Sequence, residues 1–195
     1  MLIYITNRKL CNHSFLEQIE QLAKGKPQAI MLREKDLTLA EYEELACKVK
    51  KICDSYNVNL IINQNISVAA KLNIKTVQLS MDYLRKYQDE IHSFIDIGAS
   101  VHSIDEAKEA ESLGATYLIA GHIFSTESKK GAPPRGLSFL KNVCESVSIP
   151  VFAIGGITRN AINDIKTTGA KGICIMSEAM TCEEPSALSK MFQFK

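Results

Sequence analysis

The sequence predicts a compact α/β fold, a closed (β/α)8 barrel of the TIM type, and three observations lead to this prediction. Short runs rich in β-branched residues alternate with longer stretches of helical spacing, and eight such runs follow one another along the chain. The 195 residues leave about 24 for each strand–helix unit, which suits parallel strands with right-handed crossovers, and eight units close a barrel. The stretch after the first run, residues 6–9, contains no glycine, which disfavours the alternative of an open doubly wound sheet.

Each predicted strand is four to six residues long and is followed by a segment compatible with a helix. The first, at residues 2–6, is an apolar run without a basic leader or a small-residue cleavage site, so we expect a strand in a cytoplasmic protein and no signal peptide. The eight predicted strands span residues 2–6, 29–33, 59–63, 76–79, 96–101, 117–121, 150–154 and 172–177.

The clearest predicted helix follows the second strand. Thr38 and Glu41 have the spacing of a capping box, and apolar residues then recur on one helical face as far as Ile52. This pattern predicts a helix that begins after Thr38 and packs one face against the barrel.

Two later helices have boundaries of the same kind. Ser103 and Glu106 form a second capping box, and Gly114 has the position of a C-terminal glycine. Residues 158–168 repeat this design and are followed by Gly169.

Composition limits the classes of protein to which the chain can belong. We expect one domain, residues 1–195, because 46% of the residues are hydrophobic and the length suits a single core. The net charge of +1 gives no field that would attract nucleic acid or an anionic membrane. No apolar stretch approaches the roughly 18 residues that a membrane span needs. We therefore expect a protein that binds neither nucleic acid nor membranes.

Six cysteines are scattered through the chain without a CxxC pair. This spacing argues against a zinc ribbon, a dithiol redox centre and a disulfide scaffold, so free thiols are expected and no metal site is predicted.

The turns after the seventh and eighth strands predict a phosphate site. In barrels of this kind these two loops frequently bind phosphate through backbone N–H groups, and glycine lets the backbone approach the anion. Gly155 and Gly156 follow the seventh strand, and Ser177 ends the eighth with a hydroxyl donor. The glycine pair alone is equally typical of a tight turn, so the two loops together carry the prediction.

Cationic side chains follow the second and sixth strands. Arg33 and Lys35 could bind a second anionic group of the ligand, although a solvated surface cluster of residues 33–36 would have the same composition. Arg33 shares strand parity with Met31, which favours an inward direction. Residues 125–135 read as a mobile loop over the carboxyl ends of the strands, and Lys129 on this loop is a candidate to close over the anion.

His122 is the candidate acid–base residue. It follows a glycine at the end of the sixth strand and precedes the flexible basic loop, and imidazole titrates near neutrality without special tuning. A structural or merely exposed histidine is the alternative, and His102, after the fifth strand, is its rival for a role in the site.

Taken together, these strand ends resemble those of the thiamine phosphate synthase superfamily, and more closely its thiazole tautomerase (TenI-type) branch. The resemblance covers nearly the whole chain, and it includes Asn63 at the end of the third strand. The matching stretches are residues 32–35, 62–63, 100–103, 121–126, 128–129, 153–157 and 176–177.

The two branches differ where metal is needed. By resemblance, a synthase carries an aspartate directly after Asn63 and another just past the fourth strand, and these hold the magnesium that accompanies the leaving pyrophosphate. Here those places are Gln64 and Tyr83, which cannot supply the anionic oxygens that magnesium prefers, although Asp82 is adjacent. The sixth strand ends in Gly-His, as in the tautomerase branch, where synthases usually have Gly-Pro.

The resemblance therefore implies an isomerase of thiamine biosynthesis without cofactor or metal. It would convert a carboxylated dihydrothiazole phosphate to the aromatic thiazole carboxylate phosphate, with His122 moving the protons. The phosphate would lie on Gly155, Gly156 and Ser177, and the carboxylate on Arg33 and Lys35.

Three further expectations accompany this one. A magnesium-dependent thiamine phosphate synthase, which joins a pyrimidine pyrophosphate to a thiazole phosphate and uses Asp82, is the first alternative. A non-catalytic barrel that binds thiazole or thiamine phosphates is the second. A homodimer is expected by resemblance alone.

Overall fold

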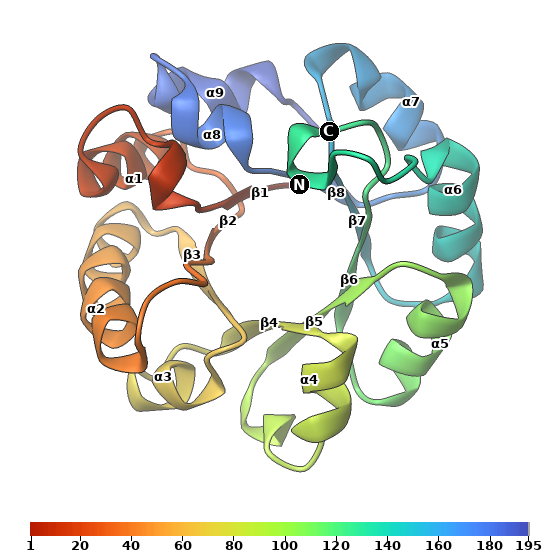
Figure 1. Ribbon diagram of the computed structural model, residues 1–195, viewed down its shortest axis with the longest axis horizontal. Helices are drawn as coiled ribbons and strands as arrows, with labels where there is room; N and C mark the ends of the chain where they lie inside the picture. Colours follow the sequence, from red (N-terminus) through yellow and green to blue (C-terminus); the bar gives the residue numbers. More distant parts are fainter. Residues whose placement is uncertain (195) are drawn as a thin grey trace.

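The computed structural model describes residues 1–194 and forms a closed parallel barrel ringed by helices, so the predicted (β/α)8 TIM barrel is confirmed (Figure 1). The strands follow one another round the barrel in chain order, and β8 pairs with β1 to close it. They are β1 Leu2–Ile5, β2 Ala29–Leu32, β3 Asn59–Asn63, β4 Thr76–Ser80, β5 Asp96–Val101, β6 Tyr117–Gly121, β7 Val151–Ile154 and β8 Gly172–Ile175.

The helices lie on the outside of the barrel (Figure 1). They are α1 Phe15–Lys24, α2 Leu39–Tyr56, α3 Ile66–Lys71, α4 Met81–Lys86, α5 Ile104–Ser112, α6 Gly136–Ser146, α7 Ile162–Thr167, α8 Ser177–Thr181 and α9 Pro185–Met191. Four 3-10 turns accompany them, namely η1 Arg8–Leu10, η2 Ile91–Ser93, η3 Glu127–Lys129 and η4 Arg159–Ala161.

Alternation along each strand produces two apolar cores. Side chains on one face of the strands fill the barrel interior, and those on the other face pack against the helices. The interior core consists of Ile3, Ile5, Ala29, Met31, Ile61, Tyr117, Ile119, Phe152 and Cys174. Met31 is therefore inside the barrel, as its parity predicts, and Arg33 lies one pleat further along, just past the end of β2.

The interior depends on Gly98 of β5. A Cβ atom at this position would overlap the side chains of Gln78 and Tyr117, which cross the barrel in front of it. Both side chains are almost completely buried, and the Gln78 amide donates to Ser100 Oγ at 3.0 Å. Glycine at position 98 thus makes room for two large side chains in the middle of the barrel.

The helix boundaries differ from the predictions at two first turns and at the end of α2, which continues beyond Ile52 to Tyr56. α2 begins with the complete capping box of Thr38 and Glu41. At α5 the Ser103 hydroxyl accepts from the Glu106 N–H, but the Glu106 carboxylate accepts from the backbone of His102 instead of Ser103. The helix expected from residue 158 starts as the 3-10 turn η4 and becomes α-helical only at α7.

The structure also bears on the thiols and on the helices. All six cysteines are free thiols, as predicted. Within residues 1–194, none of the helices combines the length and the apolar character that crossing a membrane requires.

Candidate functional site

The candidate site lies at the carboxyl ends of the strands, and the β7–α7 turn forms one wall of it. Gly155 and Gly156 have positive φ angles of 98° and 64°. A Cβ atom at Gly155 would overlap the Cβ of His122, and one at Gly156 would overlap the carbonyl oxygen of Ser125. Glycine is therefore required at both positions by backbone conformation and by close approach.

His122 is held against this turn by the pairing of β6 with β7. It follows a cis Gly121–His122 peptide bond, and its half-buried imidazole places Nε2 3.3 Å from the carbonyl oxygen of Ala132. His122 therefore lies directly beside the glycine turn. The contact with Ala132 ties the imidazole to the loop that follows β6.

The loop of residues 123–135 is anchored at both ends. The N–H of Phe124 donates to the Gly155 carbonyl at 3.0 Å, and the N–H of Arg135 donates to the His122 carbonyl at 3.0 Å. Between these anchors the loop is exposed and contains the short turn η3 with Lys129. The loop thus projects from the rim next to the glycine turn (Figure 1).

Arg33 is positioned by a buried hydrogen-bond chain that the sequence did not reveal. The completely buried Thr6 hydroxyl accepts from the Arg33 N–H at 2.9 Å and donates to Glu34 Oε1 at 2.7 Å. Glu34, only 5% exposed, also accepts from the backbone and the guanidinium of Arg8. This chain fixes the end of β2 against the end of β1, so that the Arg33 side chain starts from a rigid backbone.

Arg8 also neutralises the neighbouring carboxylate. Its guanidinium binds Asp36 in a bidentate pair at 2.6 and 2.9 Å, and Lys9 Nζ lies 2.9 Å from the same carboxylate. The hydrogen bond from Arg8 is the largest cause that holds the pKa of Asp36 well below its usual range. The acidic residues of the 33–36 stretch are thus paired with residues outside it, which leaves its cations unpaired.

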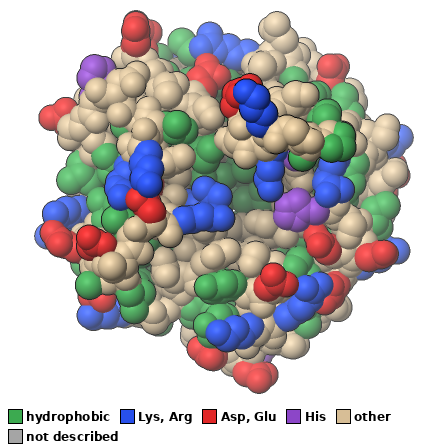
Figure 2. Space-filling model, viewed as in Figure 1, with side chains coloured by type: hydrophobic (Ala, Val, Ile, Leu, Met, Phe, Trp, Pro, Cys, Tyr) green, Lys and Arg blue, Asp and Glu red, His purple; other side chains and the backbone are tan. Residues whose placement is uncertain are grey.

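Three cations converge on the mouth without a carboxylate partner. Within residues 1–194, no Asp or Glu lies within 4 Å of the charged groups of Arg33, Lys35 or Lys129. Burial lowers the pKa of Arg33, and the charge of Glu34 opposes this; the charge of Arg33, followed by burial and by the charge of Lys129, lowers the pKa of Lys35. We call these three residues the cation cluster; Figure 2 shows Lys and Arg side chains round a hollow over the barrel.

Three predicted site residues are not part of this cluster. The Asn63 amide donates to the Gln78 carbonyl at 3.2 Å, which ties it to β4. The exposed His102 imidazole lies 3.4 Å from Glu106 of its own helix. Ser177 is the first residue of α8 and not the last of β8, and this helix of five residues is too short for the dipole contribution expected at its start.

The residues of the mouth do not fit a magnesium ion. Residues 1–194 contain no group of three or more His, Cys, Asp or Glu side chains that could hold a metal. Of the carboxylates near the rim, Glu34 and Asp36 are bound by Arg8, and Glu178 by Arg159. The Asp82 side chain is 91% exposed and lies 3.3 Å from Arg85, whose guanidinium also binds Glu109 of α5. Asp82 therefore lies in solvent beside Arg85 of its own helix.

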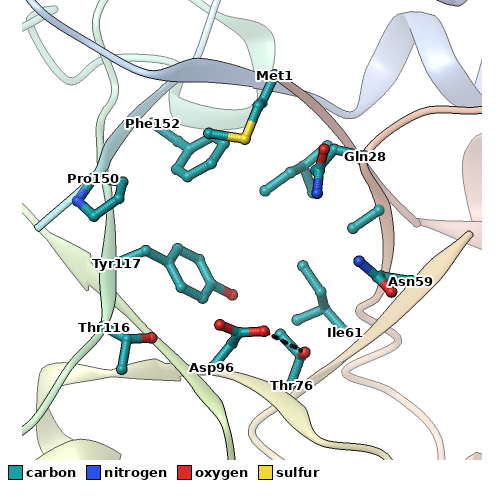
Figure 3. A pocket seen from close by; sticks show the side chains of 12 residues that line it. Met1, Gln28, Asn59, Ile61, Thr76, Asp96, Thr116, Tyr117, Pro150 and Phe152 are labelled. Atoms are coloured by element: carbon teal, nitrogen blue, oxygen red, sulfur yellow. Dashed lines mark hydrogen bonds between the residues drawn. The ribbon is translucent and has the colours of Figure 1, made fainter.

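A cavity of about 180 Å³ opens at the other end of the barrel (Figure 3). Its lining comes from the amino ends of the strands and includes the rings of Tyr117 and Phe152. Asp96 accepts a hydrogen bond from Thr76 there at 3.2 Å. None of the cation cluster lines this cavity, and the amino-terminal face of such barrels usually serves stability. The charged mouth is therefore the candidate site.

The chain is similar to known proteins over most of its length. The family described as "Thiamine monophosphate synthase" matches residues 2–179. A protein of Clostridium acetobutylicum named "Thiamine-phosphate synthase" is 38% identical over 186 residues, which cover 94% of this chain and 88% of the relative. A protein of the same name from Pyrococcus horikoshii is 35% identical over 184 residues, again 94% of this chain and 88% of the relative.

Solved structures agree with this similarity. The "Thiamine phosphate pyrophosphorylase" of Pyrococcus furiosus superimposes with a TM-score of 0.85 at 31% identity, covering 98% of this chain and 92% of that one. A 3-hexulose-6-phosphate synthase superimposes with a TM-score of 0.70 at 16% identity, covering 98% of each chain, which is a likeness of fold alone.

These relatives correct the reaction expected from the sequence. The isomerase assignment, a thiazole tautomerase with His122 as acid–base, is wrong because relatives at 35–38% identity are named synthases, which are transferases. A Gly-His dipeptide at the end of β6 does not by itself determine the reaction. The superfamily itself was recognised correctly, and the chain belongs to the thiamine monophosphate synthase family.

Proposed function

We propose that this chain is a thiamine-phosphate synthase, a transferase that joins a pyrimidine carried on pyrophosphate to a thiazole phosphate. The observation that carries the proposal is the cation cluster of Arg33, Lys35 and Lys129, which has no carboxylate partner in the described residues and lies at the barrel mouth. Like charges held together in a folded protein cost free energy unless a ligand compensates them. A leaving group with several negative charges supplies that compensation.

The reaction transfers a pyrimidinylmethyl group from the pyrophosphate oxygen to the thiazole nitrogen. The thiazole nitrogen donates its electron pair to the methylene carbon of the pyrimidine, and the bond from this carbon to the pyrophosphate oxygen breaks. Pyrophosphate leaves with that electron pair, and the thiazole ring takes a positive charge. Because negative charge builds up on the leaving oxygen, fixed cations close to it stabilise the transition state more than the bound substrate.

The two anionic groups of the substrates suit two parts of the mouth. The turn of Gly155 and Gly156 offers bare backbone to the thiazole phosphate, and the cation cluster offers side-chain donors to the pyrophosphate. Arg33 starts from the rigid end of β2, whereas Lys129 is on the anchored loop. We assign the first residue to binding in the open site and the second to closure over bound substrate.

His122 is assigned a positioning role. The bond-forming step moves no proton, so it does not need an acid–base residue there. The contact of the imidazole with Ala132, at 3.3 Å, supports a role in holding the loop that carries Lys129. His122→Ala is expected to raise KM for the pyrimidine substrate more than it lowers kcat, whereas His122→Gln, which keeps a side-chain donor, restores part of the loss.

The direct test supplies both substrates and measures thiamine phosphate by mass spectrometry. The wild-type protein should form thiamine phosphate and one equivalent of pyrophosphate, and Arg33→Gln should lose most of kcat/KM. The matched control is Lys141→Gln, an exposed residue of α6 that pairs with Glu145. A folded wild-type protein that forms no product from these substrates would refute the assignment.

A further inference from the structure

We propose that this protein binds the pyrophosphate group through Arg33, Lys35 and Lys129 without a divalent cation coordinated by its own carboxylates. The inference rests on the proposed function and concerns the same site. It follows from a disagreement between the magnesium that the family implies and the side chains that the mouth contains.

Two carboxylates, Glu34 and Asp36, alternate with Arg33 and Lys35 after β2. Glu34 is buried and has all its partners within the protein, because Thr6 and Arg8 donate to it at 2.7 to 3.2 Å. Releasing it to a metal would leave the Thr6 hydroxyl and the Arg8 backbone N–H without their acceptor and would free the end of β2. Asp36 is likewise bound by Arg8 and Lys9. Neither carboxylate is available as a ligand.

The ends of β3 and β4 have neutral side chains where the family implies magnesium ligands. Gln64 has a left-handed φ of 63°, and its N–H donates to the Gln78 carbonyl at 2.9 Å, so its backbone is fixed and its side chain is neutral. Tyr83 packs its ring 5.5 Å from that of Tyr87. Magnesium prefers anionic oxygen ligands in an octahedral arrangement, and a carboxamide with a phenol is a poor set for it.

The mouth already carries positive charge that a bound pyrophosphate can use. A metal at such a site would neutralise the pyrophosphate and hold its oxygens together. The cation cluster brings three positive charges to the same task, and the guanidinium of Arg33 can bind two phosphate oxygens at once. A metal placed among these side chains would be repelled by them. The mouth is thus built to attract an anion and not a metal–anion complex.

The test measures binding without turnover. Calorimetry with inorganic pyrophosphate in a chelating buffer should show binding to the wild-type protein, and excess magnesium should leave the affinity within about threefold or weaken it. Manganese added to the protein alone should show no bound ion by electron paramagnetic resonance. A gain in pyrophosphate affinity of about tenfold or more with magnesium would overturn the proposal.

Two variants identify the source of any metal effect. Asp82→Asn removes the carboxylate next to Tyr83, where the family implies a magnesium ligand, and Asp105→Asn is the matched control in the exposed first turn of α5. Both should bind pyrophosphate as the wild type does, with and without magnesium. Loss of a magnesium-dependent gain in Asp82→Asn alone would also overturn the proposal, because it would make Asp82 a ligand.

Turnover separates this inference from the proposed function. Formation of thiamine phosphate in chelating buffer supports both. If no thiamine phosphate forms under any metal condition, the proposed function fails, while the pyrophosphate titrations still decide how the mouth binds the anion.

Discussion

Replacing Arg33 by methionine should weaken anion binding without weakening the fold. Methionine keeps most of the side-chain stem and removes the charge. In the free protein this charge is half-buried and has Lys35 as a like-charged neighbour; no carboxylate lies within 4 Å of it among residues 1–194, although the charge of Glu34 attracts it. Its removal relieves desolvation and repulsion and also loses the attraction of Glu34, so the free energy of unfolding should stay within about 1 kcal/mol of the wild-type value.

The magnitude of the binding loss follows from the bonds that Arg33 can make. Hydrogen bonds to a charged group contribute about 1.5–3 kcal/mol, which corresponds to roughly 10- to 150-fold in the affinity for pyrophosphate. Thermal denaturation measures the first effect, which is at most about 2–4 °C in a chain of this length. Titration calorimetry with inorganic pyrophosphate measures the second.

Arg85→Met is the matched control, because its guanidinium is bound by Glu109 and Asp82 on the outer helices. It should lose a little stability, no more than about 1 kcal/mol for an exposed network, and bind pyrophosphate normally. The reasoning fails if Arg33→Met binds pyrophosphate like the wild type, or if it unfolds more than about 1 kcal/mol more easily.

Three other predictions follow from the site. Because Arg33 lowers the pKa of Lys35 and a bound anion raises it again, pyrophosphate binding should take up protons and weaken as pH rises through the pKa of free Lys35; equal heats in buffers of different ionisation enthalpy would contradict this. Gly156→Ala places a Cβ against Ser125 at a φ of 64° and should cost about 1–3 kcal/mol of unfolding free energy in urea and raise KM for thiazole phosphate. Thr6→Val should cost about 1–3 kcal/mol by leaving Glu34 short of a donor, whereas Thr6→Ser should retain wild-type stability.

The strands were predictable because their information is local. The apolar period identifies all eight, and the largest disagreement is at β8, which ends at Ile175 because α8 begins at Ser177. Capping boxes identified α2 and α5 for the same reason, since both partners lie within four residues. Where local chemistry determines the structure, the sequence was sufficient.

The candidate site was predictable only in part. The 33–36 stretch has the composition of a solvated cluster, and Glu34 is buried because Thr6 and Arg8, which follow β1, satisfy it across more than 25 positions of sequence. No pattern within the stretch distinguishes Glu34 from Asp36. The reaction was missed for a related reason, because an imidazole at a strand end is compatible with acid–base chemistry and equally with holding a loop.

The double anchoring of the 123–135 loop has a consequence for redesign. Both ends of the loop are hydrogen-bonded to neighbouring backbone, so changes in the length or sequence of the exposed part between them should leave the eight-stranded barrel unchanged. The loop can therefore be replaced by other sequences, and a library confined to it would alter which molecules the mouth admits while the barrel stays the same.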